Sequence, residues 1–341
     1  GNLTSVIGNL VSIVSPFFAG LLMAYLLYIP ENKIERSYKK AKPRFIRKNA
    51  RKFAILTTYV IAILILVIII NFILPVLIES INELIGNMEN YYNRVIETYN
   101  NLPEDSIFKT EKVYNALKEL QNFDVQQYLS LDRITGYVKG VVGFATGIFD
   151  VFVAFVVSIY ILAERNEILS FFKKLTKSMF KEKTVNKIER YFYRANGVFF
   201  KFISSQFIDA LIVGILATIV MKILNIKYAT LLGFAIGLFN MIPYFGAIIA
   251  ISISAIITLI TGGLSKAAIM LVSIIILQQI DANIINPKII GDSLEISPIL
   301  VILSVTIGGG YFGVLGMFLG VPVAAILKIL VNDYIDNKLQ V

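Results

Sequence analysis

Residues 53–78 decide the fold class: they read FAILTTYVIAILILVIIINFILPVLI and contain no charged side chain. About 20 apolar residues suffice for a helix to cross the ~30 Å hydrocarbon core of a bilayer. Three other uncharged stretches are also long enough: residues 1–30, 228–265 and 296–327. Three further apolar spans, about 141–163, 203–221 and 267–286, contain one acid each, namely Asp150, Asp209 and Asp281. These lengths predict an all-α integral membrane protein that crosses the bilayer several times.

The composition supports a membrane environment. Hydrophobic residues make up 57% of the 341 residues, charged residues make up 16%, and the mean hydropathy is +0.74. A soluble chain of this length needs more polar residues to cover its surface. We therefore expect the lipid bilayer to be the main partner of this chain.

Basic residues predict the orientation. The loop 31–52 contains ten Lys and Arg against two acids, and 164–201 contains ten against four. The intervening segment 79–135 contains five basic residues and ten acids. Because short Lys- and Arg-rich loops stay in the cytoplasm, the first two should face inward and the acidic segment outward. Anionic lipid headgroups can neutralise the basic loops, and no basic stretch is interleaved with stacking aromatics, so we expect no nucleic-acid binding.

Two missing residue types narrow the chemistry. The chain has no Cys and no His, which excludes disulfides, thiolate nucleophiles, the usual zinc sites and a Ser-His-Asp triad. No Walker A motif is present, so a transporter of this sequence would use a gradient and not ATP. We expect no enzyme activity, cofactor or metal. The absence of an initial Met predicts that the sequence begins inside a longer native chain.

Four segments are expected along the chain. They are 1–78, transmembrane helices with the basic cytoplasmic loop 31–52; 79–135, a small extracytoplasmic segment of amphipathic helices; 136–201, a transmembrane helix and a basic cytoplasmic amphipathic loop; and 202–341, a transport core with broken helices. The segment 79–135 has two interpretations: a helical cap packed on its own or a neighbouring subunit's helices, or a ligand-capture domain.

Two long uncharged stretches of the last segment are interrupted. FNMIPYFGA, residues 239–247, breaks the first, and Gly308-Gly309-Gly310 with Gly313 breaks the second. A helix broken at membrane depth is tolerated only against protein or a water-filled cavity, and paired breaks point to a transporter's binding site. The spacing of Gly233 with Gly237, of Gly309 with Gly313, and of Gly316 with Gly320 predicts close helix packing or a hinge.

The stretch QQIDANIINP, residues 278–287, places polar residues where a membrane helix should be apolar. On a helix Gln278 and Asp281 share one face, while Gln279, Asn283 and Asn286 share another, and Pro287 breaks the helix. A charge at the bilayer centre costs about 2.5–3.5 kcal/mol on insertion scales, so a lipid-facing helix could not carry this pattern. Three interpretations remain: a solvated helix end, a cavity lining that contacts substrate or cation, and hydrogen bonding between helices.

Asp209 lies eight residues beyond Lys201, which is ~12 Å along a helix and inside the hydrocarbon zone. Ser205 and Gln206 precede it by one turn and can hydrogen-bond to it. The carboxyl is either a proton or cation site or a structural group. Asp150 is nearer the outer edge and is a weaker candidate.

The predicted substrate or ion pathway collects these polar residues and the breaks. It consists of Gln206, Asp209, Asn240, Pro243, Tyr244, Gly246, Gln278, Gln279, Asp281, Asn283, Asn286, Pro287, Thr306, Gly309 and Gly310.

Three stretches carry a family resemblance: YILAERNEI at 160–168, FNMIPYFGAIIA at 239–250, and QQIDANIINPKIIGDSLEISPILVILSVTIGGGYFGVLGMFLGVPVAAILK at 278–328. Their order, with Ile-Pro-Tyr-x-Gly, Gln-x-x-Asp-x-Asn-x-x-x-Pro and Phe-Gly-x-x-Gly before Val-Pro, resembles the autoinducer-2 exporter family of PerM-type bacterial permeases. The resemblance covers most of the chain.

The resemblance implies about seven to eight spans in the bacterial cytoplasmic membrane, a cytoplasmic N-terminus and a homo-oligomer. It implies a secondary-type transporter that exports a small polar molecule such as autoinducer-2, with coupling to sodium or protons. Two alternatives stay open, because some members are sodium(lithium)/proton antiporters and others are sporulation-associated. The chain is then either such an antiporter or a non-transporting membrane assembly protein.

Overall fold

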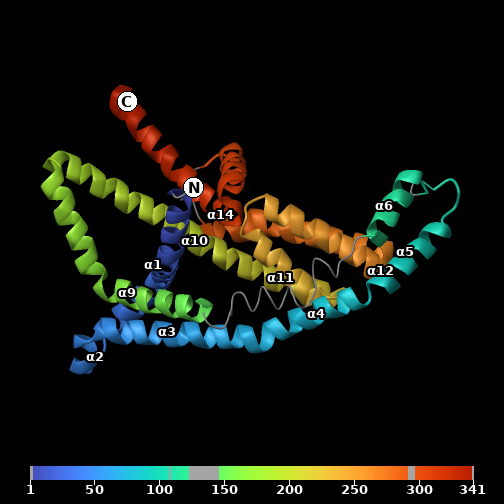
Figure 1. Ribbon diagram of the computed structural model, residues 1–341, viewed down its shortest axis with the longest axis horizontal. Coiled ribbons are helices and arrows are strands. Elements are labelled where there is room, and N and C mark those ends of the chain that lie inside the picture. Colours follow the sequence, from blue (N-terminus) through green and yellow to red (C-terminus); the bar gives the residue numbers. More distant parts are fainter. Residues whose placement is uncertain (1–2, 107–108, 123–145, 291–295, 340–341) are drawn as a thin grey trace. The chain divides into compact units, whose positions relative to one another are not determined.

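A computed structural model describes residues 3–106, 109–122, 146–290 and 296–339, and all regular structure in these ranges is helical (Figure 1). Four of the described helical segments are long and apolar enough to cross a membrane: Ala50–Gly86, Glu182–Ile223, Phe245–Ile289 and Pro298–Asp336. The predicted all-α class is confirmed. The number of spans stays a prediction, and residues 123–145, where one predicted span begins, lie outside the described ranges.

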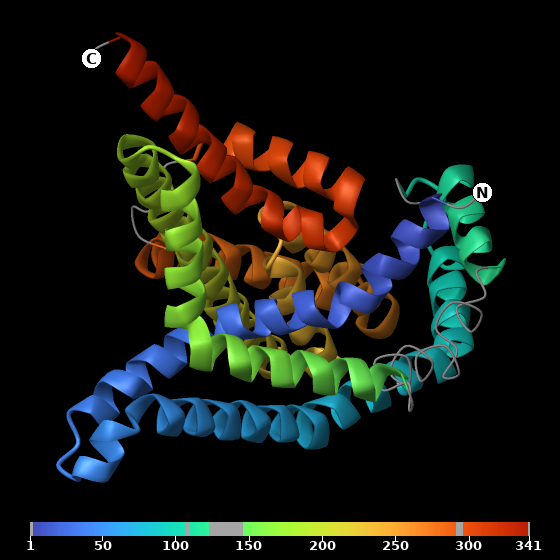
Figure 2. The ribbon, with the colours of Figure 1, turned by 60° about the vertical axis from the view of Figure 1, so that its left-hand side comes forward.

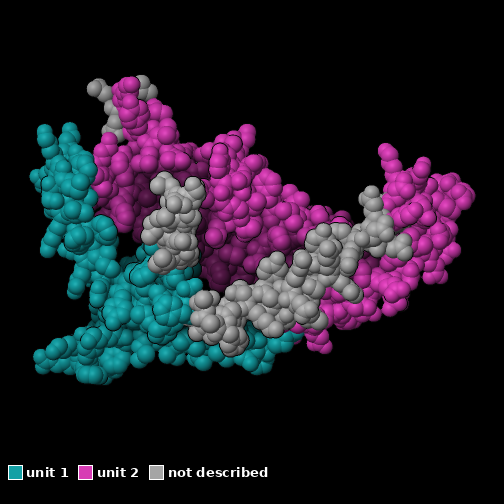
Figure 3. Space-filling model, viewed as in Figure 1, with its two compact units in different colours: residues 1–75, 125–186 teal, residues 76–124, 187–341 magenta. Residues whose placement is uncertain are grey.

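The elements follow in chain order. They are α1 (Leu3–Lys39), α2 (Arg44–Lys48), α3 (Ala50–Ile68), the π-helix η1 (Ile69–Ile73), α4 (Leu74–Gly86), α5 (Met88–Asn100), α6 (Glu111–Asn122), α9 (Thr146–Met179), α10 (Glu182–Ile223), α11 (Ala229–Asn240), α12 (Phe245–Ile280), the π-helix η2 (Asp281–Ile285), α13 (Asn286–Ile290) and α14 (Pro298–Leu339). They form two compact units, coloured separately in Figure 3: residues 1–75 with 125–186, and residues 76–124 with 187–341.

The first unit is built on α1, α3 and α9, which pack on one another (Figure 2). Tyr59 of α3 is buried between them; its hydroxyl lies 2.5 Å from the Ser158 hydroxyl, and its ring meets Phe155 edge-on at 4.9 Å. A Cβ added at Gly20 would lie 2.7 Å from the carbonyl oxygen of Ala154, so α1 and α9 approach closely only because this residue is glycine.

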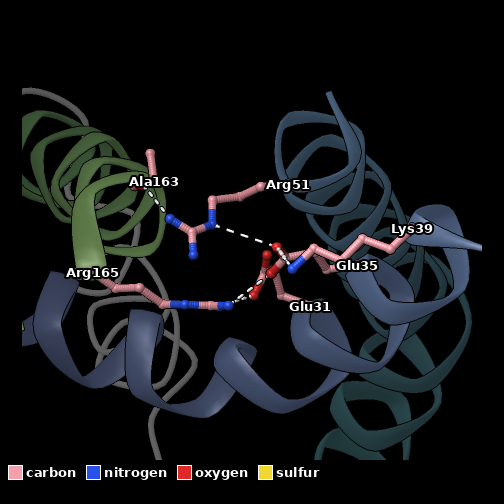
Figure 4. Close-up of polar contacts among 6 residues, drawn as sticks. All are labelled: Glu31, Glu35, Lys39, Arg51, Ala163 and Arg165. Atoms are coloured by element: carbon pink, nitrogen blue, oxygen red, sulfur yellow. Dashed lines mark hydrogen bonds and ion pairs between the residues drawn. The ribbon is translucent and has the colours of Figure 1, made fainter. Parts of the chain in front are cut away.

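A buried charge cluster joins the last turns of α1, the start of α3 and the middle of α9 (Figure 4). Arg165 of α9 forms ion pairs with two acids of α1, Glu31 and Glu35, which are 0% and 3% exposed. The Arg165–Glu35 contact measures 2.7 Å, and Lys39 holds the other Glu35 oxygen at 2.8 Å. Arg51 of α3 lies 3.8 Å from the same oxygen and donates to the Ala163 carbonyl at 3.2 Å. Two acids and three bases therefore balance one another where burial would otherwise penalise each charge.

The core of the second unit lies between α10, α11 and the two arms of α12. Residues on one face of α10, including Val213, Ala217 and Met221, are fully buried there with Leu232 and Ile236 of α11. Gly214 of α10 lies against Gly233 and Gly237 of α11, and a Cβ at either α11 glycine would collide with α10. The structure thus confirms close packing at this glycine pair.

Two of the long helices fold back or bend at a glycine with positive φ. In α12 this residue is Gly263 (φ 81°), and in α14 it is Gly313 (φ 60°). The two arms of α14 form a hairpin, visible in red and orange in Figure 2, because Gly308 lies against Gly316 and Gly320 against Ser304. The interrupted stretch 296–327 is therefore a helical hairpin and not one straight span.

Some helices extend further than the sequence indicates. The basic residues of 164–201 lie in α9 and α10, apart from Lys181 in the short turn at 180–181 that joins these two helices. Likewise α1 continues to Lys39, because its last turns supply the acids of the charge cluster. The predicted amphipathic helices of 79–135 are present as α4, α5 and α6 as far as residue 122.

We predict that Arg165→Leu lowers the stability of the protein by about 3–5 kcal/mol, because it leaves the buried Glu31 carboxylate without its basic partner. The measurement is thermal unfolding in detergent, followed by helical circular dichroism. Arg47→Leu, which removes an exposed charge in the same unit, should change little. Replacing Glu31 by Met together with Arg165→Leu should recover part of the loss. A single variant as stable as the wild type would contradict the proposed role of the cluster.

We also predict that Gly237→Ala destabilises the second unit by about 1–3 kcal/mol, the usual cost of overpacking. Its Cβ would lie 2.6 Å from the Ala210 carbonyl oxygen and 2.7 Å from the Gly214 Cα. The matched control is Gly197→Ala in α10, where nothing lies within 4 Å and alanine should stabilise the helix. Equal melting temperatures for both variants would refute the packing argument.

Candidate functional site

Three polar side chains from different elements meet inside the second unit. Asp209 of α10 is 1% exposed, Asn240 at the end of α11 is 8% exposed, and Asp281 at the start of η2 is 5% exposed. The Asn240 amide donates to Asp209 Oδ2 at 2.9 Å. The Asp281 carboxyl lies within hydrogen-bonding reach of both Asp209 and Asn240. We call Asp209, Asn240 and Asp281 the aspartate cluster.

Residue Asn240 reaches Asp209 because α11 is short. The helix has 12 residues and is therefore ~18 Å long, too short to cross a bilayer. Its last residue supplies the amide to Asp209, and its carbonyl oxygen accepts a hydrogen bond from Gln206 Nε2 at 2.8 Å. The negative end of the α11 dipole thus lies beside two carboxyl groups, which favours a cation or a proton at this place.

A tight turn separates α11 from α12. Residues 241–244 form it, and Tyr244 adopts the left-handed region at φ 65°. Two residues later Gly246 is pressed against the carbonyl of Phe239, so that no larger residue fits. This turn fixes the end of α11, and with it the Asn240 side chain.

The Asp281 side chain is positioned by a π-helical turn. The α-helical pattern of α12 ends at Ile280 and continues as η2 and α13. Short π-helical turns occur frequently at functional sites in proteins. The neighbouring α13 is tied to α10 by the Ser205 hydroxyl, which donates to the Ile289 carbonyl at 3.3 Å.

The two carboxyl groups of the cluster are undercompensated. Oδ1 of Asp209 and Oδ1 of Asp281 are buried, and neither has a hydrogen-bond donor among the described residues. Two adjacent buried carboxyl groups cannot both stay ionised without a counter-charge. The arrangement can therefore hold one proton between the carboxyl groups, or a small monovalent cation bound by carboxylate and amide oxygens.

The other polar residues of QQIDANIINP lie in different surroundings. Gln278 is half-buried, and its Nε2 has no partner in the described part of the chain. Gln279 and Asn283 are exposed, and Asn283 Nδ2 donates to the Gln279 carbonyl at 2.8 Å. Asn286 is half-buried and Pro287 is exposed. The two helical faces predicted from the sequence thus separate into a buried face with Asp281 and an exposed face.

The remaining predicted site residues do not join the aspartate cluster in the described contacts. Thr306 donates to the carbonyl of its own helix at Ile302, and Gly309 lies against Met317 in the α14 hairpin. Gly310 and Tyr244 are exposed, and Pro243 is half-buried in the turn after α11. The weaker candidate Asp150 is exposed on α9.

Two buried hydroxyl groups were missed by the sequence reasoning. Ser254 and Thr258 lie one turn apart on the first arm of α12, each 1% exposed, and neither hydroxyl has a partner in the described ranges. Most helical hydroxyls bond to a carbonyl of the preceding turn, as Thr261 does to Ile257. The only sequence signal was their spacing of four residues inside an uncharged stretch.

Comparison with known proteins shows the family of this chain. The sequence pattern of the AI-2E family transporters matches residues 3–336, nearly the whole chain. This chain belongs to the AI-2E transporter family. YueF of Bacillus subtilis (strain 168), whose name assigns it provisionally to transport, is 24% identical over 319 residues, 92% of this chain and 83% of YueF.

Two other relatives have more specific names. The AI-2 transport protein TqsA of Escherichia coli (strain K12) is 29% identical over 120 residues, which is 35% of this chain and 35% of TqsA. A sodium-lithium/proton antiporter of Halobacillus andaensis is 23% identical over 246 residues, 72% of this chain and 67% of the antiporter.

We predict that Asn240→Ala destabilises the protein by about 1–3 kcal/mol, the cost of leaving a buried acceptor without its donor. Thermal unfolding in detergent is the measurement. Asn283→Ala removes an exposed asparagine of the neighbouring η2 and should have almost no effect. In a protein that already carries Asp209→Asn, Asn240→Ala should lower the stability by less. If the effects of the two substitutions on stability simply add, the Asn240–Asp209 hydrogen bond does not contribute as proposed.

Proposed function

We propose that this AI-2E family transporter exports a small polar molecule by a secondary mechanism, and that the aspartate cluster binds the coupling proton or sodium ion. One observation carries the coupling proposal: two buried carboxyl groups from α10 and η2 adjoin each other, and among the described residues a single amide donates to them. In the first unit, by contrast, the buried carboxylates of Glu31 and Glu35 pair with basic side chains.

The helix breaks support transport over a static role. The C-terminal end of α11 and the π-helical turn at Asp281 both place polar backbone groups beside the aspartate cluster, inside an apolar core. Secondary transporters use such discontinuous helices to bind substrates and ions near the middle of the membrane. We assign the substrate pathway to the residues around this point, with Gln206 and Gln278 facing it, and we place the protein in a bacterial cytoplasmic membrane.

An antiporter without an organic substrate is the second candidate. The Halobacillus andaensis relative is named as a sodium-lithium/proton antiporter and matches 72% of this chain. In this case the two carboxylates are the whole site, because exchange of one cation for protons needs no further ligand. TqsA supports the small-molecule proposal instead, through the substrate in its name.

The test is flux in proteoliposomes. With an imposed proton or sodium gradient, we expect the wild-type protein to move the furanosyl signal autoinducer-2. Asp209→Asn and Asp281→Asn should each lower gradient-driven flux by about tenfold or more, in the usual range of coupling energies. Asp150→Asn is the matched control, since this acid also lies in an apolar helix but is exposed.

The outcomes separate the candidates. Cation flux in the absence of any organic substrate, lost in both variants, would favour the antiporter. Unchanged flux in both variants would remove the aspartate cluster from the mechanism. Wild-type protein that moves neither the signal nor cations, with a cellular phenotype that depends on 79–135, would favour the assembly role.

A further inference from the structure

A second polar site lies away from the aspartate cluster, at the opposite end of α12's first arm. A pocket of about 420 Å³ opens between α5, Lys227 in the turn before α11, and Thr261 of α12. Thr261 follows the turn after α11 by 17 residues, so the pocket is ~25 Å along the helix from that turn. Every residue that lines it has a polar side chain. The charge distribution of the sequence assigns this end to the outer side of the membrane.

Hydrogen bonds and an ion pair link the residues at the floor of the pocket. Tyr91 of α5 is 4% exposed, and its hydroxyl lies 3.0 Å from the Tyr228 hydroxyl. Lys227 donates to the Tyr91 hydroxyl at 2.7 Å, pairs with Glu83 at 2.7 Å, and lies over both tyrosine rings. Hydrogen bonds from Lys227 to Glu83 and Tyr91 raise the pKa of Lys227, so the ammonium stays charged. This network holds α5 against the start of α11.

The wall formed by α5 offers free polar groups. Asn90, Asn93, Arg94 and Glu97 lie three to four residues apart, which places them along one side of the helix. Their side chains make no hydrogen bond or ion pair within the described part of the chain. Each group is thus free to bind a ligand without first breaking an internal contact.

The charges of the pocket cancel. Lys227 is neutralised by Glu83, and the free Arg94 lies one turn from the free Glu97. No net field therefore selects an anion or a cation. The asparagine amides each present both donors and an acceptor, which matches the hydroxyl group, itself a donor and an acceptor.

We propose that this pocket binds a small neutral polyhydroxylated molecule on the outer side of the membrane, through the free amides of Asn90 and Asn93 with Arg94 and Glu97. The volume is within the usual range for small-molecule sites. The proposal stands independently of the coupling role of the aspartate cluster, because it concerns equilibrium binding at a different place and requires no transport.

The test is isothermal titration of the protein in lipid nanodiscs with three related probes. D-ribose is the neutral polyol, D-ribose 5-phosphate adds an anion, and L-alanine is a zwitterion. We expect ribose to bind, and Asn90→Ala and Asn93→Ala each to weaken its affinity by about three- to tenfold, as loss of one hydrogen bond does. The control is Glu89→Ala, an exposed residue of α5 outside the pocket, which should leave affinity unchanged.

Several outcomes would overturn the proposal. No heat of binding for ribose, or equal weakening by Glu89→Ala, removes the site. Preference for ribose 5-phosphate or alanine overturns the ligand class. All pocket substitutions are at exposed positions, and circular dichroism of each variant verifies the fold. Asp209→Asn should bind ribose normally, so failure of the coupling proposal and failure of this one are distinguishable.

Discussion

The cost of burying a carboxylate organises both units of this protein. A charge inside a low-dielectric core persists only when a partner compensates it. In the first unit Arg165, Lys39 and Arg51 surround Glu35, so α1, α3 and α9 are joined by ion pairs. In the second unit Asp209 and Asp281 have each other and one asparagine. The first arrangement pairs each acid with a base, whereas the second leaves one buried oxygen of each carboxyl group without a donor among the described residues.

Small residues place this incomplete pair. Gly214, Gly233 and Gly237 let α11 lie directly on α10, and α11 is short enough to end beside Asp209. In a bilayer, where helix association depends on close packing, such contacts replace the hydrophobic effect between helices. The backbone carbonyl groups at the C-terminal end of the short helix α11 therefore lie deep in the core, beside the Asp209 carboxyl group.

Local signals in the sequence predicted the helical membrane class, the packing glycines and the unusual character of Asp209 and Asp281. Uncharged length and residue spacing are properties of a single segment, so they can be read without tertiary information. The meeting of Asp209, Asn240 and Asp281 could not be derived, because it depends on contacts between distant segments.

The charge cluster was missed for the same reason: Glu31 and Glu35 look like loop residues until Arg165 faces them. The assignment of the other residues to the pathway stays a prediction.

The π-helical turn that begins at Asp281 has a mechanical consequence. Such a turn contains one residue more than an α-helical turn, and each α-helical residue rotates the chain by about 100°. If this extra residue migrated along the helix, the side chains it passed would be swung around the axis while the backbone stayed hydrogen-bonded. A carboxyl group could in this way change its neighbours without any separation of packed helices.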